Sequence, residues 1–272
     1  MTSPTLLLVG GGKMGGALIG GWLETGIAAK CVTVVEPNTD IHAYLQSDLG
    51  VQAIADPEEL EAGYLPDVIL LAVKPQMMDK VAPLYARFTG GKTVFLSIAA
   101  GTPIARFQDW LGAAAPIVRA MPNTPAAIRQ GMTVLCPGPG VSEAQRDLCQ
   151  SLLSAVGAVE WLDGEGLMDA VTAVSGSGPA YVFWLAECLA KAGVDAGLPE
   201  DLAQKLASET VTGAGALMAQ SPEPPATLRQ NVTSPGGTTA AALAVLMAEN
   251  GLAPLMMRAV AAATKRGKEL AG

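Results

Sequence analysis

Short runs of β-branched and other apolar residues alternate with amphipathic stretches up to Glu160. The runs have the length of buried strands, and the stretches between them repeat their apolar positions with helical spacing. The predicted strands are Leu6–Val9, Val32–Val35, Val68–Val73, Thr93–Ile98, Ile117–Val118, Thr133–Leu135 and Ala158–Trp161, and the clearest helical stretches are Met14–Glu24, Gln76–Phe88 and Glu143–Val156. This alternation predicts an α/β domain with a doubly wound, mostly parallel sheet and helices on both faces.

The pattern changes after Trp161. All nine isoleucines lie at or before Ile128, and the rest of the chain is rich in Ala, Leu and Met, which favours helices. We therefore expect two domains, a sheet domain over residues 1–162 and an all-α domain over residues 163–272. Tyr181–Ala192 is apolar on nearly all sides, so this helix is expected to be buried in a core or against another subunit. The second domain carries more apolar surface than it can cover alone, which predicts a homo-oligomer associating through the C-terminal helices.

Composition excludes several classes of protein. Half of the 272 residues are apolar and 15% are charged, so the chain is not intrinsically disordered. The net charge of −8 is opposite to that of proteins that bind nucleic-acid phosphates. No stretch resembles a membrane span of about 20 apolar residues, and no basic leader precedes the first apolar run. We expect no nucleic-acid or membrane partner, and a cytoplasmic location.

The metal-binding and nucleophilic residue types are sparse. The single histidine, His42, leaves no basis for a His-rich metal site or a Ser-His-Asp triad. The four cysteines, Cys31, Cys136, Cys149 and Cys188, match no zinc or redox spacing and are expected to be free thiols. We therefore expect no metal site.

A glycine-rich turn follows the first predicted strand directly. Gly10, Gly12 and Gly15 fit the spacing G-x-G-x-x-G between a strand and a helix. Gly10 permits the tight turn, Gly12 lets the backbone approach a diphosphate, and Gly15 allows close packing of helix against strand. The diphosphate binds at the start of the helix, so Lys13 and Met14 are counted among the cofactor-binding residues. The motif predicts a Rossmann site for NAD(H) or NADP(H); the alternative is a glycine turn without a ligand.

Glu36 closes the second predicted strand, about 20 residues past the glycines. A carboxylate at this place accepts hydrogen bonds from the adenosine ribose hydroxyls and repels a 2′-phosphate, which favours NADH over NADPH. No arginine stands in Pro37–Thr39 to bind such a phosphate. The alternative is an ordinary solvated carboxylate at the end of a strand.

Further candidates stand at the ends of later strands, which open into the ligand crevice of a doubly wound sheet. The small residues of Ser97–Gly101 leave space for a nicotinamide ring, and Asn123 is placed to bond the cofactor carboxamide or ribose. Arg119 has either a role in this site or a structural ion pair, and Lys74 is either a crevice residue or a surface lysine. The cofactor-binding candidates are Ala72, Val73, Lys74, Pro75, Ala99, Ala100, Gly101 and Asn123.

Two loops rich in Gly, Ser, Pro and Thr precede helices of the second domain. One is Ser175–Pro179 and the other is Thr233–Thr239. Such loops expose successive backbone N–H groups and hydroxyls, which suits a small carboxylate. Plain helix capping is the alternative for each loop alone. Two such loops together with a dinucleotide motif predict a substrate site.

The chain resembles the pyrroline-5-carboxylate reductases, the last enzymes of proline synthesis, over almost its whole length. The resemblance implies reduction of the cyclic imine L-1-pyrroline-5-carboxylate to L-proline by hydride transfer from NADPH or NADH. It also implies a helical dimerisation domain, with dimers assembled into a decamer. It rests on six segments, of which the last is the most specific: Gly10–Gly15, Val73–Gln76, Ser97–Gly101, Arg119–Pro125, Ser175–Ala180 and Val232–Leu243.

The resemblance assigns roles to residues of the two loops. It implies that Thr239 hydrogen-bonds the ring nitrogen and relays its proton, and that Ser175 lies close to nicotinamide and substrate. An iminium is a good electrophile, so the absence of a catalytic histidine is no objection. Glu36 departs from family members that prefer NADPH, which carry Ser, Asn or Arg after the second strand. The groups implied to hold the substrate carboxylate are the Ser234 hydroxyl and the N–H groups of Gly236, Gly237 and Thr238.

Other interpretations remain open. One is a related dehydrogenase with the same architecture that acts on β-hydroxy acids or another imine. The β-hydroxy acid enzymes need a lysine on the helix after the first loop, and Lys191 comes too late after Ser175–Pro179. The other is a non-catalytic module that senses NAD(P), which would not require the Ser234–Thr239 loop.

Overall fold

The computed structural model describes residues 3–271, which form two compact units. The first unit runs up to Gly176 and includes the end of the chain from Thr264 on, and the second comprises Ser177–Ala263. Helix α10 (Leu252–Ala271) therefore begins in the second unit and ends in the first. Residues 163–176, which the sequence pattern assigns to the second domain, pack with the first unit. The assignment of residues 163–272 to substrate binding and dimerisation stays a prediction.

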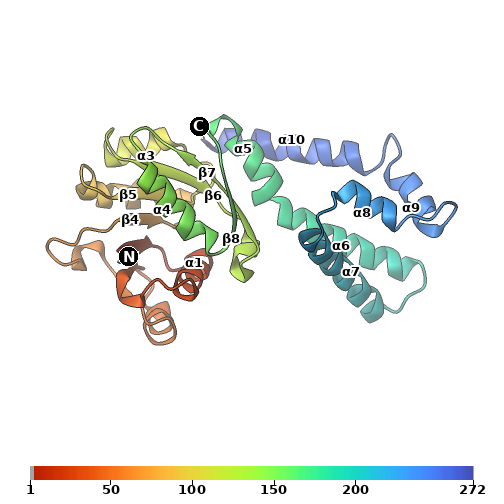
Figure 1. Cartoon of the computed structure of the whole chain (residues 1–272), viewed down its shortest axis with the longest axis horizontal. Helices are drawn as coiled ribbons and strands as arrows, with labels where there is room; N and C mark the ends of the chain where they lie inside the picture. Colours follow the sequence, from red (N-terminus) through yellow and green to blue (C-terminus); the bar gives the residue numbers. More distant parts are fainter. Residues whose placement is uncertain (1–2, 272) are drawn as a thin grey trace. The chain divides into compact units, whose positions relative to one another are not determined.

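An eight-stranded sheet forms the first unit, in the order β3-β2-β1-β4-β5-β6-β7-β8 (Figure 1). All neighbouring strands are parallel except β6 and β7. This confirms the predicted doubly wound, mostly parallel sheet. The strands are β1 (Leu6–Val9), β2 (Val32–Val35), β3 (Gln52–Ile54), β4 (Val68–Leu71), β5 (Val94–Ser97), β6 (Ile117–Met121), β7 (Gly131–Pro137) and β8 (Gly157–Trp161).

Helices cover both faces of the sheet because successive strand residues point to opposite faces. Leu6 and Leu8 lie in one apolar core with residues of α1 and α4, and Leu7 and Val9 lie in another with residues of α2 and α3. The central strands are thus apolar on both faces, as is usual for parallel strands between two helix layers. Besides the end of α10, the α-helices of this unit are α1 (Lys13–Glu24), α2 (Met78–Val81), α3 (Ile104–Leu111), α4 (Glu143–Ser154) and α5 (Met168–Val171).

Two elements differ from the sequence prediction. The sequence does not predict β3, because a strand of three residues is too short for alternation to show. The single helix expected over Gln76–Phe88 is wrong, since α2 is followed at once by a 3₁₀ segment, Ala82–Phe88. Pro83 has no backbone N–H and its ring clashes with the preceding turn, so the α-helix ends at Val81.

Short helical turns complete the first unit. They connect strands and helices and include the turn that leads towards α6. The 3₁₀ segments are Ala29–Cys31, Thr39–Ile41, Pro57–Glu59, Pro75–Met77, Ala82–Phe88, Thr124–Ile128 and Glu165–Leu167, and the π-helical turns are Tyr44–Asp48 and Thr172–Gly176.

The second unit is helical. Its longest helices pack closely: a Cβ on Gly193 of α6 would lie 3.2 Å from the Cβ of Ala203 on α7. The apolar stretch of α6 is uncovered in the single chain, where Phe183 is 62% and Trp184 is 64% exposed. Of the two expected ways to bury this stretch, the structure therefore favours contact with another subunit. The helices are α6 (Gly178–Asp195), α7 (Glu200–Gln220), α8 (Pro225–Asn231), α9 (Thr238–Leu246) and the first part of α10.

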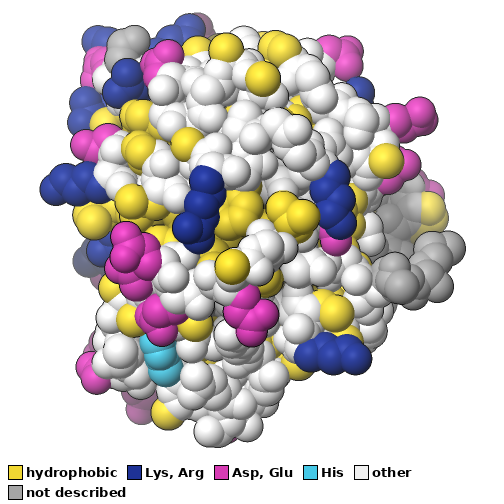
Figure 2. All heavy atoms as spheres, turned by 90° about the vertical axis from the view of Figure 1, so that its left-hand side faces the viewer, with side chains coloured by type: hydrophobic (Ala, Val, Ile, Leu, Met, Phe, Trp, Pro, Cys, Tyr) yellow, Lys and Arg dark blue, Asp and Glu magenta, His cyan; other side chains and the backbone are white. Residues whose placement is uncertain are grey.

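The surface carries charges of both signs. Figure 2 shows one face of the molecule, on which basic and acidic side chains are interspersed with exposed apolar ones. Within residues 3–271, no helix is both long and apolar enough to cross a lipid bilayer.

Candidate functional site

The glycine turn lies at the carboxyl edge of the sheet, where parallel strands end side by side. Val35, Val9, Leu71 and Ser97 are in register on β2, β1, β4 and β5. The residues that follow these four, Gly10 among them, therefore emerge at one edge. Because β1 pairs with β2 on one side and β4 on the other, this edge is the switch point at which ligands bind in such sheets.

Packing requires two of the three glycines. Gly10 has a φ of 101° and donates its N–H to the Val35 carbonyl at 2.9 Å. A Cβ on Gly10 would lie 3.0 Å from the Ala72 carbonyl oxygen. A Cβ on Gly15 would overlap the Gly10 carbonyl oxygen, so α1 can start this close to β1 only with glycine at that position.

The third glycine is open. No described neighbour lies within 4 Å of the place a Cβ on Gly12 would take. Gly12 caps α1, and the N–H groups of the following residues, Lys13 and Met14, have no partner within the helix. An anion at this place is stabilised by these donors and by the helix dipole. Beside it, a groove of about 800 Å³ is lined by Gly11, Gly12, Ile41 and others, a volume typical of cofactor sites.

Glu36 ties the glycine turn to the end of β2. Its Oε2 accepts the Gly11 N–H at 2.8 Å, and its Oε1 accepts the Asn38 N–H at 2.9 Å. The Glu36 carbonyl oxygen lies 2.7 Å from Nε2 of His42. The carboxylate is thus part of the turn, and each of its oxygens retains a lone pair for a hydroxyl donor such as a ribose.

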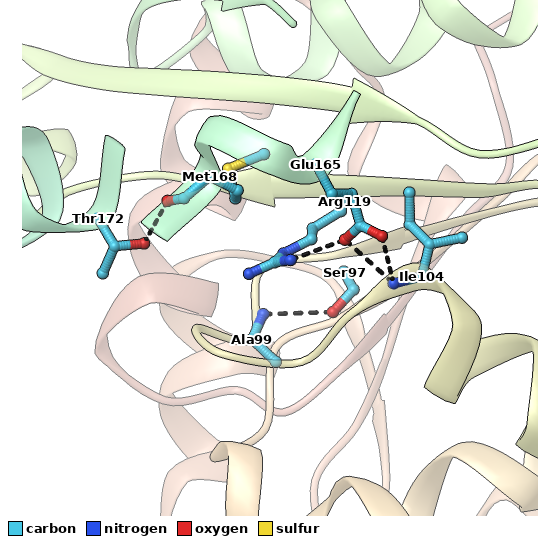
Figure 3. A network of polar contacts seen from close by, with 7 residues as sticks. All are labelled: Ser97, Ala99, Ile104, Arg119, Glu165, Met168 and Thr172. Carbon is cyan, nitrogen blue, oxygen red and sulfur yellow. Dashed lines mark hydrogen bonds and ion pairs between the residues drawn. The ribbon is translucent and has the colours of Figure 1, made fainter. Parts of the chain in front are cut away.

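The loops after β4 and β5 form the other half of this edge. The Ala72 N–H donates to the Val9 carbonyl at 2.8 Å. The Ala99 N–H donates to Ser97 Oγ at 3.2 Å (Figure 3). Gly101 has a φ of 72°, a left-handed conformation that glycine adopts without strain. Of the predicted residues, Ala99 is buried, Ala72, Val73 and Gly101 are half-buried, and Lys74, Pro75 and Ala100 are exposed. Exposure of Lys74 is compatible with both of its interpretations.

Arg119 forms a structural ion pair, one of its two expected roles. It lies on β6, is 4% exposed, and its Nη1 is 2.7 Å from Glu165 Oε1 (Figure 3). The Glu165 oxygens also accept the Ile104 N–H, each at 3.1 Å, and so cap α3. Sequence reasoning missed Glu165. The available signal was Arg119 itself, because an arginine within a buried strand requires a carboxylate partner.

Asn123 and Ser175 lie together, although 52 positions separate them in the sequence. Asn123 Nδ2 donates to the Ser175 carbonyl at 3.2 Å and to Ser175 Oγ at 3.3 Å. Asn123 Oδ1 accepts the Met132 N–H at 2.9 Å. The amide thus connects the loop after β6 to β7 and to the turn before α6.

The predicted substrate residues form one turn at the start of α9. Gly236 has a φ of 72°, and the Gly237 N–H donates to the Ser234 carbonyl at 3.0 Å. Gly237 therefore closes the turn with its N–H, while Thr238 and Thr239 open the helix. The structure thus gathers the predicted cofactor residues and Ser175 in the first unit, and the predicted carboxylate-binding residues in one turn of the second.

The four cysteines are free, as expected; Cys136 and Cys149 are buried, Cys31 is half-buried and Cys188 is exposed. Burial raises the pKa of the Cys149 thiol to about 12 and raises the pKa of Cys136 as well. In the described part of the chain, no group of three His, Cys, Asp or Glu side chains could hold a metal ion.

Two family models match the chain. Residues 165–270 match the model described as pyrroline-5-carboxylate reductase dimerisation. Residues 5–101 match the model described as NADP oxidoreductase, coenzyme F420-dependent. The second match spans β1 to β5 with the glycine turn, and the first indicates that the chain oligomerises.

The chain is also similar to individual proteins over its whole length. It is 41% identical over 271 residues to pyrroline-5-carboxylate reductase of Pseudomonas aeruginosa, covering 100% of this chain and 98% of that protein. A solved pyrroline-5-carboxylate reductase from Coxiella burnetii has a TM-score of 0.93 at 35% identity, covering 99% of both chains. A Plasmodium falciparum pyrroline carboxylate reductase with NADP bound has a TM-score of 0.82 at 29% identity, covering 100% of both chains.

The buried ion pair leads to a stability prediction. Glu165→Ala leaves the Arg119 guanidinium buried without its carboxylate and removes the acceptor for the Ile104 N–H. We expect the free energy of unfolding, measured by urea denaturation, to fall by about 3–5 kcal/mol. Glu165→Gln keeps an oxygen acceptor and is expected to lose less.

Asp109→Ala is the control, because it breaks an exposed pair with Arg106 at 3.7 Å. Such pairs contribute between about 0 and 1 kcal/mol. Equal unfolding free energies for Glu165→Ala and Asp109→Ala would contradict the structural role of Glu165.

Proposed function

The chain belongs to the pyrroline-5-carboxylate reductase family, and we infer that it reduces L-1-pyrroline-5-carboxylate to L-proline with NADPH or NADH. The observation that carries this inference is the 41% identity that covers 100% of the chain. Such coverage includes both the glycine turn of the first unit and the turn before α9. The reaction class is therefore oxidoreduction at a C=N bond.

The first unit offers the groups that a dinucleotide needs. Gly12 and the N–H groups of Lys13 and Met14 receive the diphosphate at the start of α1. Packing of Gly10 and Gly15 holds these donors at the carboxyl edge of the sheet. The small residues of the loops after β4 and β5 border the nicotinamide end.

The second unit offers donors for the substrate carboxylate. The Ser234 hydroxyl and the N–H groups of Gly236 and Thr238 hold it at the start of α9, where the helix dipole favours an anion. Gly237 contributes by closing the turn through its bond to the Ser234 carbonyl. Carboxylate binding at this place presents the ring of the imine to the neighbouring Thr239.

Thr239 is the residue placed to handle the proton of the ring nitrogen. Bound NADPH or NADH supplies the hydride that reduces the C=N carbon. The Thr239 hydroxyl hydrogen-bonds the ring nitrogen: it passes a proton from water to a neutral imine, and it accepts a hydrogen bond from the N–H of an imine that is already protonated. Thr239 is half-buried, and its hydroxyl forms no hydrogen bond with another described residue. A positioned hydroxyl suffices because an iminium is already a strong electrophile.

We expect the protein to oxidise NADH or NADPH when pyrroline-5-carboxylate is added. The reaction is measured as a loss of absorbance by the reduced nicotinamide. Thr239→Val removes the hydroxyl and keeps the size of the side chain. We expect kcat/KM for the imine to fall about ten- to a hundredfold, the loss of one hydrogen bond to a charged group.

Thr210→Val is the matched control, because Thr210 is exposed on α7 and outside the proposed site. If folded wild-type protein binds a dinucleotide but does not turn over the imine, the substrate assignment is wrong. The alternatives are then a related dehydrogenase or an NAD(P)-sensing module. Full turnover by Thr239→Val would contradict the role of its hydroxyl alone.

We propose that Glu36 shifts cofactor preference towards NADH. Its carboxylate lies at the end of β2 beside the glycine turn, held by the Gly11 and Asn38 N–H groups. A fixed negative charge at this place repels a 2′-phosphate and accepts bonds from ribose hydroxyls. The residues that follow, Pro37–Thr39, supply no positive charge to offset it.

Glu36→Gln removes this charge and keeps an oxygen for the Gly11 N–H. We expect the ratio of kcat/KM with NADPH to kcat/KM with NADH to rise about tenfold, which corresponds to about 1.4 kcal/mol. Glu61→Gln changes the net charge equally at an exposed position before β4 and should leave the ratio unchanged. If Glu36→Gln gives the wild-type ratio, Glu36 does not set the preference.

We propose that the oligomer is a homodimer formed by the C-terminal helices, and that five dimers associate into a decamer. The exposed apolar residues Phe183, Trp184 and Leu185 of α6 support the dimer, since apolar patches of this kind mark protein interfaces. The dimerisation model matches the same region of the chain.

Trp184→Lys places a charge in this proposed interface, and we expect the mass measured by light scattering to fall to that of one protomer. Leu65→Lys is the control, because Leu65 is 63% exposed in the first unit. The proposed interface is wrong if the wild type has the mass of one protomer, or if Trp184→Lys leaves the mass unchanged. If the wild type has the mass of a dimer, only the decamer is wrong.

The cysteines bear on the compartment. Cys31, Cys136, Cys149 and Cys188 are all unpaired. Free thiols are usual in proteins of a reducing compartment, so we place the reaction in the cytoplasm.

A further inference from the structure

The side chain of Asn123 joins segments of the first unit that are distant in the sequence. Its oxygen lies 2.9 Å from the Met132 backbone nitrogen, at the start of β7. Its nitrogen lies 3.2 Å from the carbonyl oxygen and 3.3 Å from the hydroxyl oxygen of Ser175. Ser175 belongs to the turn Thr172–Gly176 that precedes α6.

These neighbours determine which end of the amide is which. A backbone N–H can only donate, so the atom facing Met132 must be the amide oxygen. A backbone carbonyl can only accept, so the atom facing the Ser175 carbonyl must be the NH₂ group. A reversed amide would place donor against donor and acceptor against acceptor. The orientation of Asn123 is therefore fixed by two groups that cannot change roles.

This orientation sets the direction of the Ser175 hydroxyl. Its oxygen accepts a hydrogen bond from Asn123, so its proton points away from the amide. Within residues 3–271, no other group takes part in a hydrogen bond with this hydroxyl. The Ser175 hydroxyl is thus presented as a donor, available to an oxygen acceptor of a ligand.

Packing holds the turn in place. A Cβ on Gly176 would overlap the terminal methyl group of Met121, so the turn lies directly against the end of β6. Met168 and Ala173 are fully buried, and the Thr172 hydroxyl donates to the Met168 carbonyl at 2.9 Å. Ser175 therefore has little freedom to turn its proton elsewhere by moving its backbone.

We propose that Asn123 is a positioning residue that makes Ser175 a hydrogen-bond donor to a carbonyl or carboxylate oxygen of a bound ligand. The inference rests on the proposed function and on the family resemblance, which implies that Ser175 lies close to nicotinamide and substrate. Two ligand oxygens have this chemistry: the carboxamide oxygen of the cofactor and a carboxylate oxygen of the imine. In this role Asn123 acts through Ser175, in place of the direct bond to the cofactor carboxamide or ribose that the sequence predicts.

Asn123→Asp tests the proposal with nearly unchanged shape. One carboxylate oxygen still accepts the Met132 N–H. The other loses the hydrogen bond to the Ser175 carbonyl, accepts the Ser175 proton and turns the hydroxyl away from the ligand. We expect kcat/KM to fall about tenfold, with a similar loss for Ser175→Ala. The double variant is expected to be no worse than the poorer single variant, because both changes remove the same donated hydrogen bond.

The Michaelis constants identify the acceptor. A rise in KM confined to NADH or NADPH indicates the cofactor carboxamide, and a rise confined to the imine indicates the substrate carboxylate; either supports the proposal. Asn250→Asp, an exposed position in the second unit, controls for the added charge and should match the wild type. If Asn123→Asp does not fold, Asn123→Ala takes its place in the series.

Losses that multiply in the double variant would overturn the proposal, because Asn123 would then act independently of Ser175. Wild-type kinetics for Asn123→Asp would overturn it too. Melting temperatures measured on the same proteins separate a loss of folding from a loss of the donor. The proposed function fails separately, since it requires turnover of the imine by the wild type.

Discussion

The parallel register at β1 is the constraint on which the first unit depends. β1 pairs with β2 on one side and β4 on the other, so all three strands send their following loops to one edge. Parallel neighbours must be joined by crossovers, usually helical, and these cover the two faces of the sheet. The first crossover begins with α1, which can approach β1 because Gly15 has no side chain. The anion site at the start of α1 therefore follows directly from the way the sheet is built.

A second constraint governs how the chain leaves the sheet. Arg119 is buried within β6, and a buried guanidinium is tolerated only with a carboxylate and well-placed acceptors. Glu165 meets this requirement and caps α3 with the same two oxygens. The segment that starts at Glu165 is held again at its far end, where Asn123 bonds Ser175. Two polar contacts thus set the course of the segment leading into the helical unit.

Local pattern was sufficient to predict most of the sheet and the glycine turn. Runs of β-branched residues reveal strands, and the need for glycine at Gly10 and Gly15 arises within a few residues of the chain. The same holds for the turn before α9, where Gly236 and Gly237 shape the backbone. Local sequence pattern did not predict features that depend on a single missing atom or on partners distant in the sequence. Pro83 ends α2 because a single N–H is missing.

Long-range partners could not be predicted for a different reason. Glu165 lies 46 positions from Arg119, and several acidic residues would have served equally well by sequence. Ser175 was a candidate and Asn123 was another, but nothing in either segment shows that they meet. Only the path of the chain through β6 and the turn before α6 brings them together.

The two outer strands of the sheet have a consequence for self-association. β3 has three residues and exposes Gln52, and β8 exposes Ala158 and Glu160. A very short strand at one edge and the outward charge of Glu160 at the other offer a poor template for adding the strand of another molecule. Copies of this chain are thereby discouraged from growing into an open-ended ribbon by extending one sheet into the next. Association is left to other surfaces, such as the exposed apolar residues of α6, and most soluble homo-oligomers are closed and symmetric.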